Sequence, residues 1–354
     1  MIQHAAGAVA LFIVLGGAAI AQTPPPPQEP QAQPPAPTEK KVERFAPSAV
    51  RNVSFTYTTE IAPNPSGQQL EVWIPLPRND SYQRVGNISV QAPIQHEIVD
   101  QGRFRNRVVH LVGAVSRVKP LKITIRSEIT RREQIADFSQ AELPQPEPSD
   151  GAFAPFLRAD RLVPIDGRIA VVSASIGSNN ASPLEQARAL YDYVILIMKY
   201  DKTGEGWGRG DALYACDVRK GNCTDFHSLF IALARARGIP ARFVMGFPLG
   251  NPGGGEIGGY HCWAEFFSGG VWVPVDASEA WKNPARHNYY FGRLDADRVA
   301  FTMGRDLELK PPARGEPVNF LIYPYVEMDG TPLAKEAAKN KFEYRDLQMA
   351  DSGE

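Results

Sequence analysis

The stretch "GNCTDFHSLFIALARARGIPAR", residues 221–242, places three chemically active side chains at the start of one predicted helix: Cys223, Asp225 and His227. Asn222 is a favourable N-cap for this helix, and Gly238 is a favourable stop beyond its last turn. A thiol attacks as its thiolate, and a helix N-terminus lowers the pKa of a thiol in the first turn. The helix start alone favours a small buried cysteine, and Cys223 becomes the candidate nucleophile only together with a histidine and an acid elsewhere in the chain.

A cysteine nucleophile needs a histidine that handles its proton and an acceptor that orients the second nitrogen of that histidine. Two predicted strands further along, "YHCWAEFFS" and "VWVPVDAS", carry His261 and Asp276 and are joined by Gly269-Gly270, a strong hairpin turn. Pairing across this turn brings His261 close to Asp276. Because side chains alternate along a strand, we expect Cys262 to point away from the helix start if His261 faces it.

Four blocks of the sequence resemble the transglutaminase-like superfamily: residues 221–226 (GNCTDF), 238–242 (GIPAR), 261–265 (HCWAE) and 272–276 (WVPVD). The resemblance is strong over residues 182–278 and implies a papain-like α+β core. By this resemblance Cys223 is the nucleophile, His261 the base and acid, and Asp276 the orienting carboxylate of a Cys-His-Asp triad. Cys262 stands where the family commonly has alanine.

The reaction that this resemblance implies is acyl transfer on an amide or peptide bond through a thioester intermediate, with no cofactor. We expect hydrolysis, because water is always available and transamidation needs a dry acceptor site. Protein-glutamine transamidation and a non-catalytic periplasmic binding or assembly module that retains the fold stay open as alternatives. The Cys223 N–H is a candidate oxyanion donor, and the resemblance suggests Trp207 as a second.

The other polar side chains near Cys223 are expected to support the site: Asn222, Asp225 and His227. Asp225 favours the helix dipole from the first turn. His227 lies one turn from Cys223 on the same helix, which seldom gives the angle that a base needs. These residues are therefore predicted to be neighbours of the triad.

Three cysteines are too few for a disulfide scaffold: Cys216, Cys223 and Cys262. An oxidising compartment would allow Cys216 and Cys262 to form a disulfide, which leaves Cys223 free. The cysteines and histidines lack the short C-x2-C spacing of structural zinc sites, so no metal is expected.

The remaining pattern predicts the α+β fold class, with a papain-like core of helices on an antiparallel sheet preceded by a small β-sandwich. Ser182-Pro183-Leu184-Glu185 predicts a helix to about Lys199. Alternating apolar residues from 50 to 131 predict short antiparallel strands. The glycine-rich residues 201–222 are predicted to lack regular structure.

The predicted organisation has five parts: a signal peptide (1–21), a proline-rich linker (22–47), a β-sandwich-like domain (48–140), a catalytic domain (150–310) and a C-terminal extension (311–354) that ends in a polar tail. We therefore expect an exported protein, periplasmic or secreted. The n-region lacks Lys and Arg, so an uncleaved N-terminal segment stays open as the only membrane contact.

The charge balance bounds the partners. Lys and Arg number 38 and Asp and Glu number 39, so no net field favours nucleic acid. The expected partner is a protein or peptide substrate, such as a cell-envelope peptide. The charge-rich residues 293–306 are predicted to form a solvated or interdomain face without chemistry.

Overall fold

The computed structural model describes residues 50–63, 68–114, 116–138 and 151–348. These residues fall within one compact unit, Ala46–Glu354. The predicted signal peptide and the proline-rich linker that follows it lie outside the described residues. Within the described ranges, no helix is long and apolar enough to cross a membrane. The predicted domain boundaries stay predictions.

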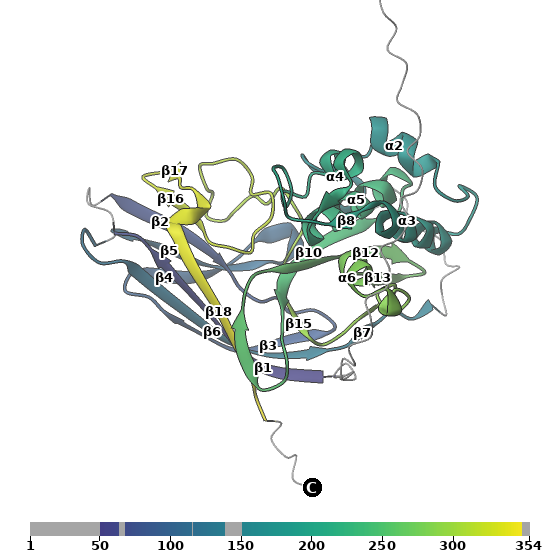
Figure 1. Cartoon of the computed structure of the whole chain (residues 1–354). Coiled ribbons are helices and arrows are strands. Elements are labelled where there is room, and N and C mark those ends of the chain that lie inside the picture. Colours follow the sequence, from purple (N-terminus) through teal and green to yellow (C-terminus); the bar gives the residue numbers. More distant parts are fainter. Residues whose placement is uncertain (1–49, 64–67, 115, 139–150, 349–354) are drawn as a thin grey trace, which may run out of the picture. The chain divides into compact units, whose positions relative to one another are not determined.

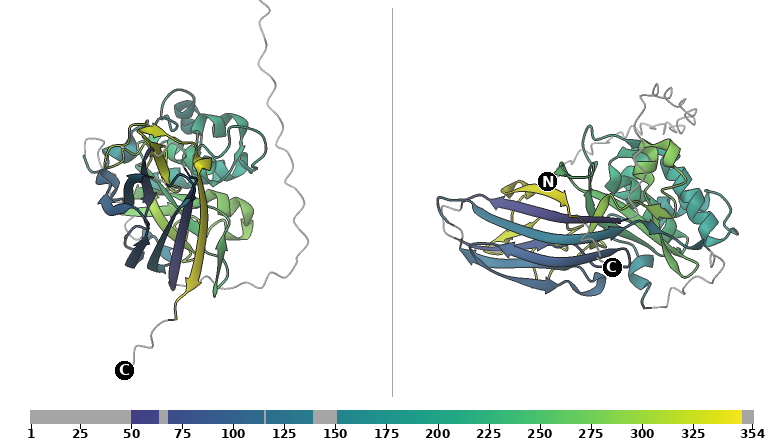
Figure 2. Two further views of the ribbon diagram at one scale, coloured as in Figure 1. Left: turned by 90° about the vertical axis from the view of Figure 1, so that its left-hand side faces the viewer. Right: turned by 90° about the horizontal axis from the view of Figure 1, so that it is seen from below.

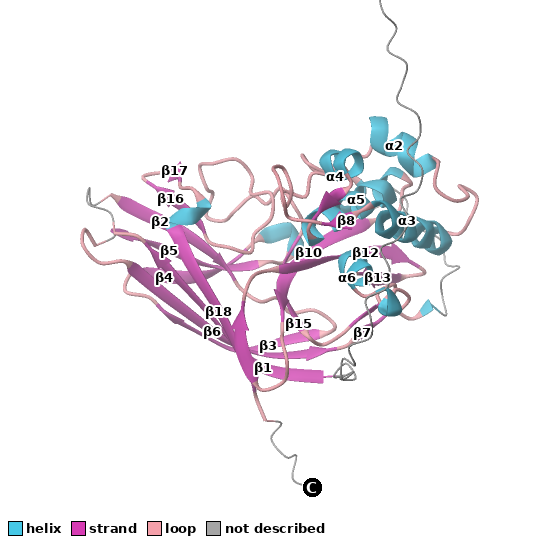
Figure 3. Ribbon diagram, viewed as in Figure 1, coloured by secondary structure: helices cyan, strands magenta, loops and turns pink. Residues whose placement is uncertain are grey.

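The β-rich part consists of two five-stranded antiparallel sheets (Figures 1 and 3). The first has the order β11 (Gly254–Ile257), β18 (Ala338–Asp346), β1 (Val50–Ile61), β6 (Leu121–Arg132) and β3 (Gln83–Gln91). The second has the order β17 (Thr331–Pro332), β16 (Tyr325–Met328), β2 (Gln69–Pro75), β5 (Arg107–Ala114) and β4 (Gln95–Asp100). Burial alternates residue by residue along β1, which confirms the period-two pattern of the sequence.

The C-terminal residues complete this part of the molecule. Strand β18 pairs antiparallel with β1 from Val53↔Asp346 to Ile61↔Ala338, and its other edge pairs with β11. The expectation of a polar tail is therefore wrong for residues 338–346. The reason is that buried Phe342 alternates there with charged side chains, so the strand looks polar by composition alone.

The strands of the β-rich part lie beside the part that carries the helices, as the right-hand view of Figure 2 shows. The two parts share one hydrophobic core. The ring of Phe55 on β1 lies 5.3 Å from that of Phe247 and 5.2 Å from that of Phe301. The Tyr57 hydroxyl donates to the carbonyl of Ile322 at 3.1 Å. The first sheet thus packs directly on strands of the papain-like core.

The papain-like core is a four-stranded antiparallel sheet with helices against it (Figure 1). Its strand order is β13 (Val271–Val275), β12 (His261–Ser268), β10 (Ala241–Pro248) and β15 (Arg298–Met303). The helices are α1 (Ala154–Leu157), α2 (Gly167–Ala174), α3 (Pro183–Ile197), α4 (Ala212–Val218), α5 (Cys223–Ala236) and α6 (Ala277–Lys282). Helix α5 packs on β12, where the rings of Phe230 and Phe266 are 6.0 Å apart.

The remaining strands form two short pairs, β7 (Gln134–Ile135) with β14 (Arg293–Leu294), and β8 (Lys199–Tyr200) with β9 (Lys220–Gly221). The second pair is parallel and ties the end of α3 to the start of α5. This pairing fixes the position of the first turn of α5, which carries Cys223, relative to the end of α3.

Local signals placed the two long helices correctly. Helix α3 begins after the Ser182 capping box, and α5 begins after Asn222, whose capping box includes Asp225. The prediction that residues 201–222 lack regular structure is wrong, because α4 lies inside them. Asp211 caps α4, because its Oδ1 accepts hydrogen bonds from two backbone N–H groups. This cap was overlooked because the residues before it are rich in glycine, which is typical of loops.

Candidate active site

The start of α5 holds Cys223 in the first turn of the helix, with 2 % of its surface exposed. Asn222 Oδ1 accepts the Thr224 N–H at 2.9 Å, and Asp225 Oδ2 accepts the Asn222 N–H at 2.9 Å. A hydrogen bond from Cys262, one from His261 and the charge of His261 hold the pKa of Cys223 well below its ordinary value, although burial opposes this shift. The thiolate is therefore the favoured form of this side chain.

His261 and Asp276 meet as the hairpin pattern predicts. Gly269 and Gly270 have φ of 57° and 78°, and the pairing of β12 with β13 runs up to Ala264↔Val275. This register leaves His261 Nε2 at 2.7 Å from Asp276 Oδ2. The other ring nitrogen of His261 is then free to face Cys223, the arrangement that a nucleophile and its base require.

Electrostatics at this contact favour a charged histidine. Burial alone would lower the pKa of His261, but the charge and hydrogen bonds of Asp276 and Cys223 raise it to about 10. Asp276 is fully buried, and despite that burial the pKa of its carboxyl lies well below the ordinary value because of His261 and Arg298. The three side chains form a buried thiolate, imidazolium and carboxylate.

Asp276 also ends the hairpin and begins the next helix. It follows β13 directly and caps α6, where its Oδ1 accepts the Glu279 N–H and the Ser278 hydroxyl, both at 3.0 Å. The carboxylate is thereby fixed at one oxygen while the other faces His261.

A second set of charges, which the sequence did not indicate, lies at this site. Arg298, 3 % exposed, donates from Nη1 to Asp276 Oδ2 at 2.8 Å, and its Nε and Nη2 bond Asp295 Oδ1 at 3.2 Å. Arg305 is also buried and bonds Ser228 of α5. Of the two alternatives predicted for residues 293–306, the solvated face is therefore wrong, whereas Asp297 does contact the β-rich part through Arg51 of β1 at 2.9 Å. These charges neutralise one another inside the protein, and the apolar run after Arg298 was the available signal.

Cys262 lies on the helix side of β12. Its Sγ is 3.8 Å from Thr224 Oγ1 and 3.7 Å from His227 Nδ1, both on α5. The expectation that Cys262 points away from the helix start is therefore wrong. His261 is the first residue of β12 and approaches Cys223 from the end of the strand, so alternation within the strand does not separate the two side chains.

The cysteines carry no disulfide. All three, Cys216, Cys223 and Cys262, are buried free thiols, so the bridge considered between Cys216 and Cys262 is not formed. Within the described ranges, no group of three or more His, Cys, Asp or Glu side chains is arranged to hold a metal ion.

His227 is fully buried next to Asp276. Its Nε2 accepts the Ala277 N–H at 3.1 Å, and burial lowers its pKa, so the ring is neutral with the proton on Nδ1. The approach of Nε2 to Asp276 Oδ1, 3.5 Å, is therefore not an ion pair. Through this hydrogen bond, His227 of α5 holds the start of α6, and with it Asp276, in a fixed position relative to α5.

Asp225 ties the glycine-rich loop to the helix start. Its carboxylate accepts the N–H of Gly208 at 2.7 Å and of Gly210 at 3.0 Å, besides that of Asn222. Trp207 lies in this loop, half-buried, and its indole N–H donates to the Gly204 carbonyl at 3.1 Å. The indole N–H is thus used within its own loop in this structure.

The first N–H of α5 is available to an oxyanion. In the described part of the chain the Cys223 N–H has no hydrogen-bond partner, as is usual for the first residue of a helix. The Tyr260 hydroxyl lies nearby, 2.9 Å from both Asn222 Nδ2 and Thr224 Oγ1. Tyr260 was not singled out in the sequence, which holds no signal for it.

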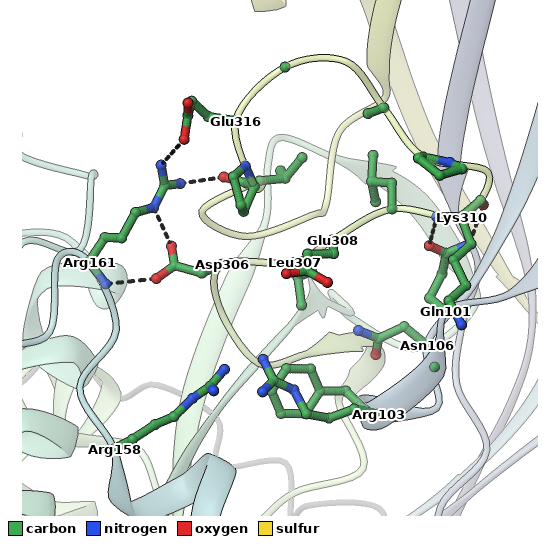
Figure 4. Close-up of a pocket in the computed structure, with 18 residues that line it drawn as sticks. Gln101, Arg103, Asn106, Arg158, Arg161, Asp306, Leu307, Glu308, Lys310 and Glu316 are labelled. Atoms are coloured by element: carbon green, nitrogen blue, oxygen red, sulfur yellow. Dashed lines mark hydrogen bonds and ion pairs between the residues drawn. The ribbon is translucent and has the colours of Figure 1, made fainter.

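A large cavity lies apart from these residues (Figure 4). It measures about 790 Å³ and is lined by Arg158, Arg161 and residues 101–104, 106, 306–310, 312–313 and 315–318, without Cys223, His261 or Asp276. Arg161 is paired with Asp306 at 3.0 Å and Glu316 at 3.5 Å. Its size alone does not connect this cavity with the chemistry of Cys223.

Comparison with known proteins agrees with the geometry. Residues 171–277 match the sequence model of the transglutaminase-like superfamily. This part of the chain belongs to that superfamily. The transglutaminase-like region includes the start of α5 and the β12–β13 hairpin and ends one residue after Asp276.

Two relatives and one solved structure extend the comparison. A Haemophilus influenzae protein described as uncharacterized is 29% identical over 318 residues, which cover 79% of this chain and 86% of that protein. A Mycobacterium leprae protein, also described as uncharacterized, is 29% identical over 130 residues, 34% of this chain and 44% of that protein. A candidate cysteine protease from Cytophaga hutchinsonii has a TM-score of 0.60 at 18% identity, over 86% of this chain and 93% of that chain. The α+β fold with a papain-like core and a β-rich N-terminal region is thereby confirmed.

Proposed function

We propose that the transglutaminase-like chain is a cysteine-dependent acyl-transfer enzyme that hydrolyses amide or peptide bonds through Cys223, His261 and Asp276. The observation that carries the proposal is the 2.7 Å contact of His261 Nε2 with Asp276 Oδ2, with Cys223 bonded to His261 at a helix N-terminus. A thiolate, a charged imidazole and an orienting carboxylate are the groups that acyl transfer needs.

In the first half-reaction, the Cys223 thiolate attacks the carbonyl carbon of the substrate and forms a C–S bond. The oxyanion that develops is stabilised by the Cys223 N–H, a contribution of roughly 3 kcal/mol for one donor. His261 then gives its proton to the nitrogen of the leaving amine, and the C–N bond breaks. The products of this step are the free amine and a thioester on Cys223.

In the second half-reaction, neutral His261 takes a proton from water, and the hydroxide attacks the thioester carbonyl. The C–S bond breaks, the acid product leaves, and the thiolate and imidazolium are restored. Asp276 stays ionised throughout, because Arg298 and two further donors hold its charge. A primary amine in place of water would give transamidation.

The test is turnover of a fluorogenic peptide library by the purified protein. Cys223→Ala and His261→Ala should each lower kcat/KM by about 10³-fold or more, and Asp276→Asn by at least about tenfold. Cys216→Ala is the matched control, because that buried thiol lies on α4 outside the site. Turnover by Cys223→Ala at the wild-type rate would refute the proposal.

The acceptor can be tested in the same reaction. We expect a fluorescent primary amine added at millimolar concentration to remain unincorporated while the acid product forms, because hydrolysis is the proposed outcome. Incorporation of the amine into a glutamine-containing protein would favour transamidation. Intact binding of a peptide without any turnover would favour a non-catalytic module.

The proposed site of action is outside the cytoplasm, with a protein or a cell-envelope peptide as substrate. The support is the apolar N-terminal stretch and the small residues at positions 19 and 21 of the sequence. Cell fractionation, with the mass of the mature N-terminus, tests this: a chain that begins after residue 21 is expected, and a full-length cytoplasmic chain would contradict it.

A further inference from the structure

The oxygen that orients His261 has a second cationic partner. Asp276 Oδ2 accepts from His261 Nε2 at 2.7 Å and from Arg298 Nη1 at 2.8 Å. Arg298 is the first residue of β15 and is 3 % exposed, so its charge is not screened by solvent. One buried carboxylate oxygen therefore divides its charge between the imidazole and a guanidinium.

Arg298 is held in place on its other sides as well. Its Nε and Nη2 both bond Asp295 Oδ1 at 3.2 Å, and its Cζ lies 5.3 Å from the centre of the Trp263 ring. Asp295 also forms an ion pair with Arg286, whose Nη2 lies 3.3 Å from Asp295 Oδ2. A guanidinium fixed in this way meets Asp276 with a constant geometry.

We propose that Arg298 is a positioning residue of the acyl-transfer site, which acts through Asp276 by drawing on its charge so that His261 can release its proton to the leaving amine. The inference rests on the proposed function of Cys223 and His261. By this inference Arg298, through Asp276, sets how readily His261 releases its proton.

The charge balance gives the direction of the effect. A carboxylate beside an imidazolium binds the proton of that imidazolium more tightly, whereas a cation on the same carboxylate weakens the hold. Asp276 itself stays in place without Arg298, because Ser278 and Glu279 fix its other oxygen. Loss of Arg298 therefore strengthens the grip of Asp276 on the His261 proton.

The other titratable and charged groups around Asp276 are either neutral or do not bond Asp276 directly. Those that face it or act on it are His227 of α5, Tyr191 of α3, Tyr290, the pair of Asp295 with Arg286, and Cys262 of β12, whose thiol pKa burial raises well above its ordinary value. His227 is neutral, and burial raises the pKa of both tyrosines, so neither ionises in the working range. Arg298 is thus the charged group, besides His261, that bonds Asp276 directly.

The test is the pH profile of Cys223 alkylation by iodoacetamide, followed by peptide mass spectrometry from pH 5 to 11. A thiolate paired with an imidazolium gives a second rise in rate when the imidazole loses its proton. Arg298→Gln should move this rise upward by about one pH unit or more, and Arg298→Lys should bring it back toward the wild-type position. With a turned-over peptide, kcat should fall about tenfold with KM unchanged.

Two further variants test the direction of the shift in pH. Asp276→Asn removes the carboxylate, and Asp295→Asn removes an anion that shares Arg298, so both should move the rise downward. Arg51→Gln is the matched control, because Arg51 is about as buried as Arg298 and pairs with two carboxylates, Asp297 and Asp346, neither of which bonds Arg298 or Asp276. It should leave the profile unchanged.

An unmoved or lowered rise in Arg298→Gln, with an unfolding midpoint close to that of Arg51→Gln, would overturn the inference. If Arg298→Gln fails to fold, an upward or unmoved rise in Asp295→Asn would overturn it instead. The alkylation profile needs no substrate, so it remains readable if the peptide library shows no turnover. Failure of the proposed function and failure of the role of Arg298 are thereby distinguishable.

Discussion

Replacement of His261 by alanine tests the buried ion pair on which the chemistry depends. In the wild type, Cys262 and His261 both hydrogen-bond the Cys223 sulfur and keep its pKa low against the effect of burial. In His261→Ala the imidazolium is gone and burial acts against a thiolate with Cys262 as its remaining close donor. The thiolate population at mildly acidic pH should therefore collapse.

The magnitude follows from the raised pKa of His261. A rise from 6.5 to about 10 corresponds to roughly 5 kcal/mol shared between Asp276 and Cys223. If about half of this belongs to the pair with Cys223, the thiolate loses about 2 kcal/mol. The pKa of Cys223 then rises, and a loss of about 2 kcal/mol corresponds to a fall of about 30-fold in the rate of alkylation at pH 6.

The assay is the rate of iodoacetamide labelling of the Cys223 peptide at pH 6. His110→Ala is the control, because His110 is a buried histidine bonded to Glu71 at 2.8 Å in the β-rich part. His110→Ala should label at the wild-type rate. A rate in His261→Ala within about threefold of the wild type would refute the ion pair.

Three further predictions concern the stability of the unit. Because the folded-state pKa of His261 is raised to about 10, its contribution is full below pH 6.5 and is lost as pH rises to 10, so urea unfolding should show falling stability over that range, and a flat profile in wild type would contradict this. Gly210→Ala should cost about 2 kcal/mol or more, since φ is 64° and a Cβ would lie 2.6 Å from Ser228 Oγ. Gly258→Ala, with open space around it, should be neutral in the same urea titration. Phe342→Ala, whose ring is 4.4 Å from that of Phe247, should cost about 3 kcal/mol by urea unfolding, and a loss below 1 kcal/mol would mean that β18 is not part of the core.

The predictable features of the fold are those with local signals. The caps at Ser182 and Asn222 and the turn at Gly269-Gly270 each satisfy or free backbone groups within a few residues, so sequence alone located α3, α5 and the hairpin. The predicted hairpin then placed His261 close to Asp276, because the turn determines the register between β12 and β13. The contact between these two side chains follows from that register.

The features that escaped the sequence depend on long-range pairing or on the end of an element. Arg298 looks solvated by composition, and its burial depends on carboxylates that the fold brings to it. Strand β18 pairs with β1, although almost the whole chain separates the two strands in sequence. Cys262 was misplaced because His261 begins its strand and is not bound by the alternation that holds further along.

The most direct test of the account is capture of the acyl-enzyme. A rapidly turned-over peptide ester, quenched in acid, should leave the acyl group on the Cys223 peptide as a thioester that hydroxylamine removes. Cys223→Ala should carry no acyl group, and Asp276→Asn should accumulate it more slowly. Turnover with the acyl group on another residue, or with none formed on Cys223 at any quench time, would contradict the account.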